Sequence, residues 1–283
     1  GQLAAAGYNV LLLDLNRQAN LADDLGYRDT DGIDDAGAGL LTALVGGTSL
    51  KPVTGVRPNL HVVPGGKKLE DLTPLLLSRF QNKGRAAFLA LAEALAPIAP
   101  NYDVVLIDSP PENTILVDLA LAAARWVIMP TKSDTGGLVG MRLVAERFAL
   151  AREVNPQLGL LGVVLFATGT GATAIHAEVR RDVTEAFGGQ SPVFSATIRH
   201  SERVGRDSRK LGKLAHELEV AAAHQPAWWE ALRRGEKTAR ISSTAASVSA
   251  DYQELATEVL QVLAAAEQDQ DGRHAAAAAG TGE

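Results

Sequence analysis

VLLLDLNRQAN at residues 10–20 and DVVLIDSPP at residues 103–111 are the two stretches of sequence that decide the fold. Each contains an unbroken apolar run that leads into an aspartate, Asp14 in the first stretch and Asp108 in the second. Unbroken runs of Val, Ile and Leu are typical of strands that are buried on both faces of a parallel sheet. The sequence therefore predicts two such strands, each with a carboxylate at its carboxyl end.

Further apolar runs of the same kind follow along the chain. They lie at residues 60–64, 126–130, 160–167 and 192–198. Between the runs, apolar residues recur with helical spacing, which predicts helices at residues 84–96, 174–187 and 251–266. Alternation of strands and helices predicts an α/β fold, with a doubly wound, mostly parallel sheet that carries helices on both faces.

Composition excludes several classes of protein. The 283 residues include 27 basic and 33 acidic side chains, a formal net charge of −6, and no cysteine. Without cysteine there is no disulfide framework, thiol catalysis or iron–sulfur cluster. The apolar runs are shorter than the roughly 18–20 residues that a membrane span requires. We therefore expect a soluble, cytoplasmic protein with no membrane association.

Two segments depart from the strand–helix alternation. Residues 221–249 contain the Trp228-Trp229 pair followed by a Ser-, Thr- and Ala-rich stretch, and we interpret them as an insertion. Residues 267–283 are low in complexity and are predicted to be a disordered tail. The main α/β domain is then expected to span residues 1–266.

The two aspartates suggest a cation site. Four apolar residues that lead into Asp108 match the Walker B arrangement, in which a carboxylate holds Mg²⁺ through water beside the phosphates of a nucleotide. Asp14 at a neighbouring strand end would concentrate negative charge there, which is costly without a cation. The alternative is an aspartate that only begins a turn.

Three stretches in the same order resemble the ParA-type partition ATPases, a deviant-Walker P-loop group that also contains MinD. They are residues 10–27, 102–131 and 196–214, and residues 251–263 are similar to the last helix of the family. The resemblance implies a P-loop NTPase-like fold that binds ATP and Mg²⁺. It also implies a homodimer that binds DNA without sequence specificity on the nucleoid and is stimulated by a centromere-binding, ParB-like partner.

The resemblance also implies roles for individual residues. Asp108 is expected to orient the water shell of Mg²⁺, and Asp14 and Asn16 are expected to complete the catalytic set. The residues expected to border the nucleotide are Gln18, Pro130, Thr131, Asp134, Ile198 and Arg199.

The sequence departs from the family pattern in two places. The family's P-loop, KGGxGK[ST], has no match in residues 1–283, and Gly65-Gly66-Lys67-Lys68 reads as a turn. We expect that the chain lacks this loop and the first central strand of the sheet, as a truncated protein would. ATP and Mg²⁺ are then expected to bind only if the missing segment is supplied. Asn16 stands where the family usually has a second aspartate, which implies either slow hydrolysis or a neutral change.

A basic run lies near the last predicted strand. Residues 199–213 contain six basic and two acidic side chains, a local balance of 6 − 2 = +4. Such a run suits contacts with DNA phosphates, although a solvated surface loop is the alternative. Its basic residues are Arg199, Arg203, Arg206, Arg209, Lys210 and Lys213. The sequence therefore predicts a partition ATPase or, as the alternative, a non-hydrolysing ParA-like DNA-binding or regulatory scaffold.

Overall fold

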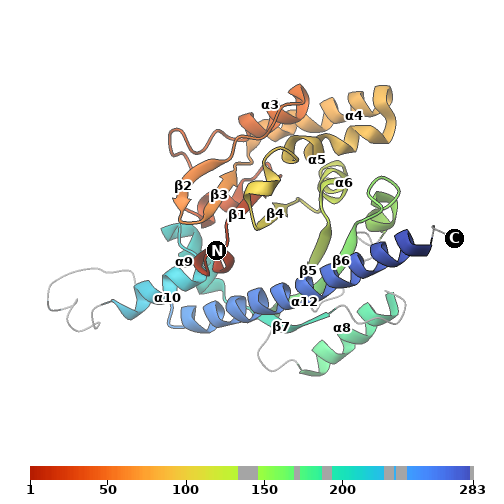
Figure 1. The fold of residues 1–283 in the computed structure, drawn as a ribbon. Helices are drawn as coiled ribbons and strands as arrows, with labels where there is room; N and C mark the ends of the chain where they lie inside the picture. Colours follow the sequence, from red (N-terminus) through yellow and green to blue (C-terminus); the bar gives the residue numbers. More distant parts are fainter. Residues whose placement is uncertain (133–145, 169–172, 187–192, 226–232, 234–240, 281–283) are drawn as a thin grey trace. The chain divides into compact units, whose positions relative to one another are not determined.

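The computed structural model describes residues 1–132, 146–168, 173–186, 193–225, 233 and 241–280 (Figure 1). The chain divides into two compact units, each with its own sheet. The first unit comprises Gly1–Arg125, Leu143–Leu158 and Ser201–Ser249. The second unit comprises Trp126–Arg142, Gly159–His200 and Ala250–Glu283.

The sheet of the first unit has the strand order β2-β3-β1-β4. Strand β1 (Val10–Asp14) lies between β3 (Leu60–Val63) and β4 (Val104–Asp108) and is parallel to both. These three strands confirm the predictions made from their apolar runs. Strand β2 (Val53–Arg57) pairs antiparallel with β3. It was not predicted, because VTGVR has neither an apolar run nor a strict alternation.

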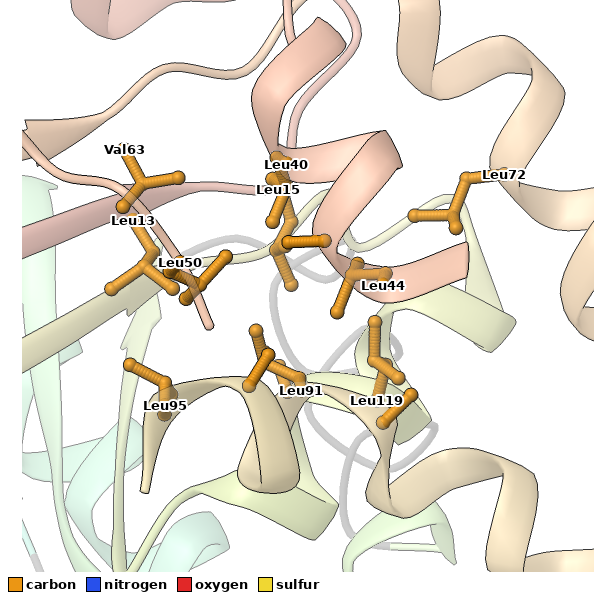
Figure 2. Close-up of a cluster of buried hydrophobic side chains, with 14 of the residues drawn as sticks. Leu13, Leu15, Leu40, Leu44, Leu50, Val63, Leu72, Leu91, Leu95 and Leu119 are labelled. Carbon is orange, nitrogen blue, oxygen red and sulfur yellow. The ribbon is translucent and has the colours of Figure 1, made fainter. Parts of the chain in front are cut away.

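Helices cover both faces of this sheet. Because successive side chains of a strand point to opposite faces, Leu11 and Leu13 enter one core and Val10 and Leu12 enter the other. Figure 2 shows Leu13 in the first of these cores. The helices of the first core are α3 (Ala38–Gly46), α4 (Leu72–Lys83), α5 (Ala90–Leu95) and α6 (Thr114–Ala123). The helices of the second core are α1 (Gln2–Ala5) and α2 (Asn20–Asp24).

The first unit also contains several short helices. Among them are the 3₁₀ helices η1 (Lys67–Asp71), η2 (Gly84–Leu89) and η3 (Ala99–Asn101), and the α-helices α9 (Glu202–Leu211) and α10 (Ala215–Ala223). The helix predicted at 84–96 therefore consists of η2 followed by α5. Part of the predicted insertion also belongs to this unit, because Ala245 and Val248 are buried against Val204 and Leu218. The tryptophan pair lies outside the described residues.

The second unit has a parallel three-stranded sheet. Its elements are β5 (Trp126–Thr131), β6 (Gly159–Thr168), β7 (Val193–Arg199), α8 (Thr173–Ala186) and the long α12 (Ala245–Gly280), which starts in the first unit. Leu255 and Val259 of α12 pack against Phe194 and Ile198 of β7. The mostly parallel sheets of the two units, with their helices, confirm the predicted α/β class.

Helix α12 extends into the segment for which the sequence predicts a disordered tail, residues 267–283. The helix continues to Gly280, and Glu267 accepts a hydrogen bond of 2.6 Å from the indole nitrogen of Trp126. Low sequence complexity suggested disorder, but the run of alanines at 275–279 has the highest intrinsic helix propensity. Among the helices of the described ranges, none is both long and apolar enough to cross a membrane.

Side chains from two helices bind the backbone of β7, the last strand in the order β5-β6-β7. Arg180 of α8 donates to the carbonyl oxygens of Val193 and Phe194, at 3.1 and 2.8 Å. Glu258 of α12 accepts from the backbone N–H groups of Ser195 and Ala196, at 2.7 and 2.8 Å. These bonds satisfy backbone groups that an edge strand would otherwise offer to another chain.

Candidate functional site

The two aspartates of the predicted cation site lie side by side at the ends of β1 and β4. Asp14 is the register partner of Asp108 across the parallel pair, so both carboxyl groups leave the same edge of the sheet. Their surroundings differ, because Asp14 is completely buried whereas Asp108 reaches solvent. The structure therefore joins one buried and one accessible carboxyl group.

Burial changes the acidity of both groups. Desolvation raises the pKa of Asp14 to about 7; the neighbouring Asp108 adds to this rise, while a hydrogen bond from the Asn16 N–H opposes it. Partial desolvation also raises the pKa of Asp108. Asp14 Oδ1 accepts that 2.8 Å bond from Asn16, while its buried Oδ2 has no hydrogen-bond partner among the described residues. A buried carboxylate oxygen without a partner is costly unless a proton or a cation satisfies it.

The pair fits a hydrated Mg²⁺ ion. This ion usually keeps several waters and takes one or two carboxylates together with the phosphates of its ligand. Asp14 and Asp108 supply two adjacent carboxylates, and Asp14 Oδ2 is free to accept. The described part of the chain has no group of three or more His, Cys, Asp or Glu side chains suited to a metal. Phosphate and water oxygens would therefore supply most of the ligands.

The loop after β1, residues 15–19, is held by hydrogen bonds with a side chain within it and with a side chain that follows it in the sequence. Asn16 Oδ1 accepts a 2.8 Å bond from the Gln18 N–H, and Ala19 takes a left-handed conformation with φ +49°. Arg28 Nη2 donates to the carbonyl oxygens of Gln18 and Ala19, at 3.0 and 2.7 Å. Asp23 holds the same guanidinium through two bonds, of 2.6 and 2.7 Å. Asn16 thus forms a turn, which an aspartate oxygen could form equally well.

Two residues of this site were missed by the sequence analysis. Arg28 lies nine residues after Ala19, and no local pattern links it to the carbonyl groups that it binds. Gly65 was interpreted as part of a turn, but it lies directly against the loop. A Cβ atom there would come within 2.6 Å of Asp14 O and 2.7 Å of Asn16 O. Its position directly after the apolar run at 60–64 was the available signal.

The other predicted nucleotide contacts belong to the second unit. Thr131 is buried at the end of β5, next to Pro130, and Ile198 is part of the core of this unit. Arg199 donates two bonds of 2.7 Å from Nε and Nη2 to Asp251. Asp134 lies outside the described residues. The structure therefore brings together Asp14, Asn16, Gln18 and Asp108 in the first unit, whereas the other four described residues belong to the second.

The predicted basic run forms the exposed face of α9. The Ser201 side chain caps the start of the helix by accepting from Val204 N–H, and Gly212 ends it with φ +58°. Val204 is buried against Leu218, which fixes the side of α9 that faces the protein. The basic side chains on or just after the helix are exposed, namely Arg203, Arg206, Arg209, Lys210 and Lys213. The sixth, Arg199, precedes the helix and belongs to the second unit.

Comparison with known proteins agrees with this geometry. Residues 1–160 match the family model described as an AAA domain. The chromosome partitioning protein ParA of Caulobacter vibrioides is 30% identical over 228 residues, which cover 78% of this chain and 80% of that protein.

Solved structures show the same fold. Apo McdA from Cyanothece aligns with a TM-score of 0.65 and 23% identity, over 77% of this chain and 84% of that chain. Cobyrinic acid a,c-diamide synthase from Mycobacterium smegmatis, with a bound ATP analogue and magnesium, aligns with a TM-score of 0.59 and 25% identity, over 85% of this chain and 90% of that chain. From the family match and the ParA relative together, we conclude that this chain belongs to the ParA/Soj/MinD family of AAA-domain ATPases.

Proposed function

We propose that this protein binds ATP with Mg²⁺ and couples nucleotide binding to homodimerisation and DNA binding in chromosome or plasmid partitioning. The observation that carries the proposal is the Asp14–Asp108 pair at adjacent strand ends, with one buried carboxylate oxygen free to accept. When bound, Mg²⁺ neutralises charge on the phosphates that react. Asp108, which reaches solvent, would hold the ion through water, and the buried Asp14 beside it would add negative charge that favours a cation.

The remaining site residues take the roles that the family implies. Asn16 would help to position the attacking water. The residues proposed to border the nucleotide are Gln18, Pro130, Thr131, Asp134, Ile198 and Arg199. The buried carboxyl group of Asp14 favours a cation there, because its pKa of about 7 leaves it partly protonated at neutral pH until a positive charge arrives.

The exposed face of α9 is the proposed DNA surface. Lysine and arginine contacts to phosphates supply affinity without sequence information, which suits nonspecific binding. Arg199, in the second unit, is also proposed to contact DNA. A ParB-like partner and a cytoplasmic location on the nucleoid complete the proposal.

A non-hydrolysing DNA-binding scaffold is the second candidate function. It is favoured by Asn16, which occupies the position of a usual aspartate. In this case α9 would still bind DNA, but the Asp14–Asp108 pair would not support turnover.

Binding of a fluorescent ATP analogue to the full chain tests the proposal, with and without Mg²⁺ and duplex DNA. We expect Mg²⁺-dependent binding that Asp108→Asn abolishes. Asp103→Asn is the matched control. Asp103 directly precedes β4, at the end opposite Asp108, and its side chain accepts a 2.7 Å hydrogen bond from the Asn9 N–H. DNA binding without ATP binding would favour the scaffold, and a folded chain that binds neither would refute both candidates.

A further inference from the structure

The backbones of α2 and α9 touch at two glycines. Gly26, just after α2, has φ +70°, and Gly212, which ends α9, has φ +58°. A Cβ atom on Gly212 would lie 2.4 Å from Gly26 Cα, and one on Gly26 would lie 2.9 Å from Gly212 Cα. Only glycine therefore allows this approach, both for its left-handed backbone and for the missing side chain.

One arginine binds the ends of both helices at this contact. Arg57 of β2 donates from Nη1 to the carbonyl oxygen of Leu25, at 3.0 Å, and from Nη2 to that of Gly212, at 2.8 Å. Glu217 at the start of α10 accepts from Nε and Nη2 of the same guanidinium. A cation at the carboxyl ends of two helices also stabilises their dipoles. We name Gly26, Arg57 and Gly212 the α2–α9 junction.

The α2–α9 junction is continuous with the loop beside Asp14. Asp23 of α2 holds Arg28, which in turn binds the carbonyl oxygens of Gln18 and Ala19. Asp24, which follows Asp23 in α2, forms an ion pair with Arg209 of α9, with 3.7 Å between Asp24 Oδ1 and Arg209 Nε. Hydrogen bonds, an ion pair and a backbone contact thus connect the loop after β1 with the basic helix, all within the first unit.

We propose that the α2–α9 junction positions the basic helix α9 relative to the loop after β1. A ligand that changes the stability of the loop then changes the stability of α9 as well, and the reverse also holds. This proposal rests on the proposed function only for the identity of the two ligands, DNA at α9 and a nucleotide at the loop after β1. Arg57 is in this sense a positioning residue for α9. The mechanical link itself involves no ligand and can be measured without one.

Hydrogen exchange of the full chain tests the link through a pair of glycine variants. Gly212→Ala and Gly47→Ala each place a side chain on a left-handed glycine at the end of a helix, with φ +58° and +64°. A Cβ on Gly47 meets nothing within 4 Å, whereas one on Gly212 meets the backbone of Gly26. The two variants therefore share the backbone strain and differ in the contact with α2.

We expect Gly212→Ala to speed amide exchange in residues 16–26 by about tenfold, while Gly47→Ala leaves that segment unchanged. Faster exchange confined to α9 and its C-terminal turn would overturn the proposal. If Gly212→Ala fails to fold by circular dichroism, Arg57→Lys replaces it. This variant keeps the charge but loses the planar fork, and we expect faster exchange in both residues 16–26 and α9. Exchange like that of the unmodified chain would overturn the proposal.

A second arm adds random-sequence duplex DNA at low salt. In the unmodified chain we expect DNA to slow exchange in α9 and also in residues 16–26, whereas in Gly212→Ala it slows exchange in α9 alone. Protection of α9 without any effect on residues 16–26 in the unmodified chain would overturn the link. If DNA does not slow exchange in α9, the proposed DNA surface is refuted. The comparison of Gly212→Ala with Gly47→Ala without DNA would still test whether the junction links α9 to the loop.

Discussion

Asp14→Asn is expected to stabilise the chain at pH 8 and to leave its stability nearly unchanged at pH 4. Burial raises the pKa of Asp14 from 3.8 to about 7 in the folded chain. An acid with a higher pKa in the folded state binds more protons there, so the free energy of unfolding falls as the pH rises between these two values. With 1.36 kcal/mol for each pKa unit, the loss reaches up to about 4 kcal/mol. Asparagine keeps the acceptor for the Asn16 N–H and removes the charge.

Urea unfolding at pH 4, 6 and 8 measures this effect. The difference in unfolding free energy between Asp14→Asn and the unmodified chain should grow from near zero to at most about 4 kcal/mol across this range. Asp31→Asn, at an exposed aspartate, is the control and should show no such growth. Parallel pH profiles for the unmodified chain and Asp14→Asn would refute the argument from burial. If Mg²⁺ binds at this carboxylate, it should narrow the difference at pH 8 by stabilising only the unmodified chain.

Three further changes test other parts of the structure. Reversing the charge of Arg203 and Arg206 should weaken binding to random duplex DNA. The slope of log affinity against log salt concentration should become smaller by about 0.9 for each phosphate that is no longer neutralised. Fluorescence anisotropy at several salt concentrations measures the affinity and the slope, and an unchanged slope would exclude these residues from the interface. In a chain that includes the glycine-lysine loop, Asn16→Asp should raise ATP turnover, measured as phosphate release; an unchanged rate would show that the asparagine is not limiting. Glu258→Ala leaves two N–H groups of β7 without their acceptor and should cost about 1–3 kcal/mol in urea unfolding. An unchanged midpoint would contradict this role, and the exposed Glu112→Ala is the control.

Much of the fold could be predicted because its signals are local. The apolar runs that end in Asp14 and Asp108 predicted two parallel strands, and the structure pairs both with the aspartates in register. Strand β2 has no local signal and forms because β3 offers it an edge.

Contacts between distant residues could not be predicted. Arg57 and Glu217 are 160 positions apart, and nothing in either neighbourhood indicates that one guanidinium joins the ends of two helices. Gly26 and Gly212 likewise look like ordinary helix-ending glycines until their backbones are seen in contact. Such contacts depend on how helices and strands pack against one another, and the local pattern of a single sequence does not indicate that packing.

The sequence by itself determined the α/β class, the two carboxyl groups at strand ends and the basic run at residues 199–213, because hydrophobic spacing and charge are properties of short segments. Only the tertiary structure decided that Asp14 is buried with a free oxygen while Asp108 reaches solvent, although both follow the same kind of apolar run. Burial depends on which distant residues cover a group, and that coverage sets its pKa and its affinity for a cation. The same packing connects the loop beside Asp14 to the basic helix.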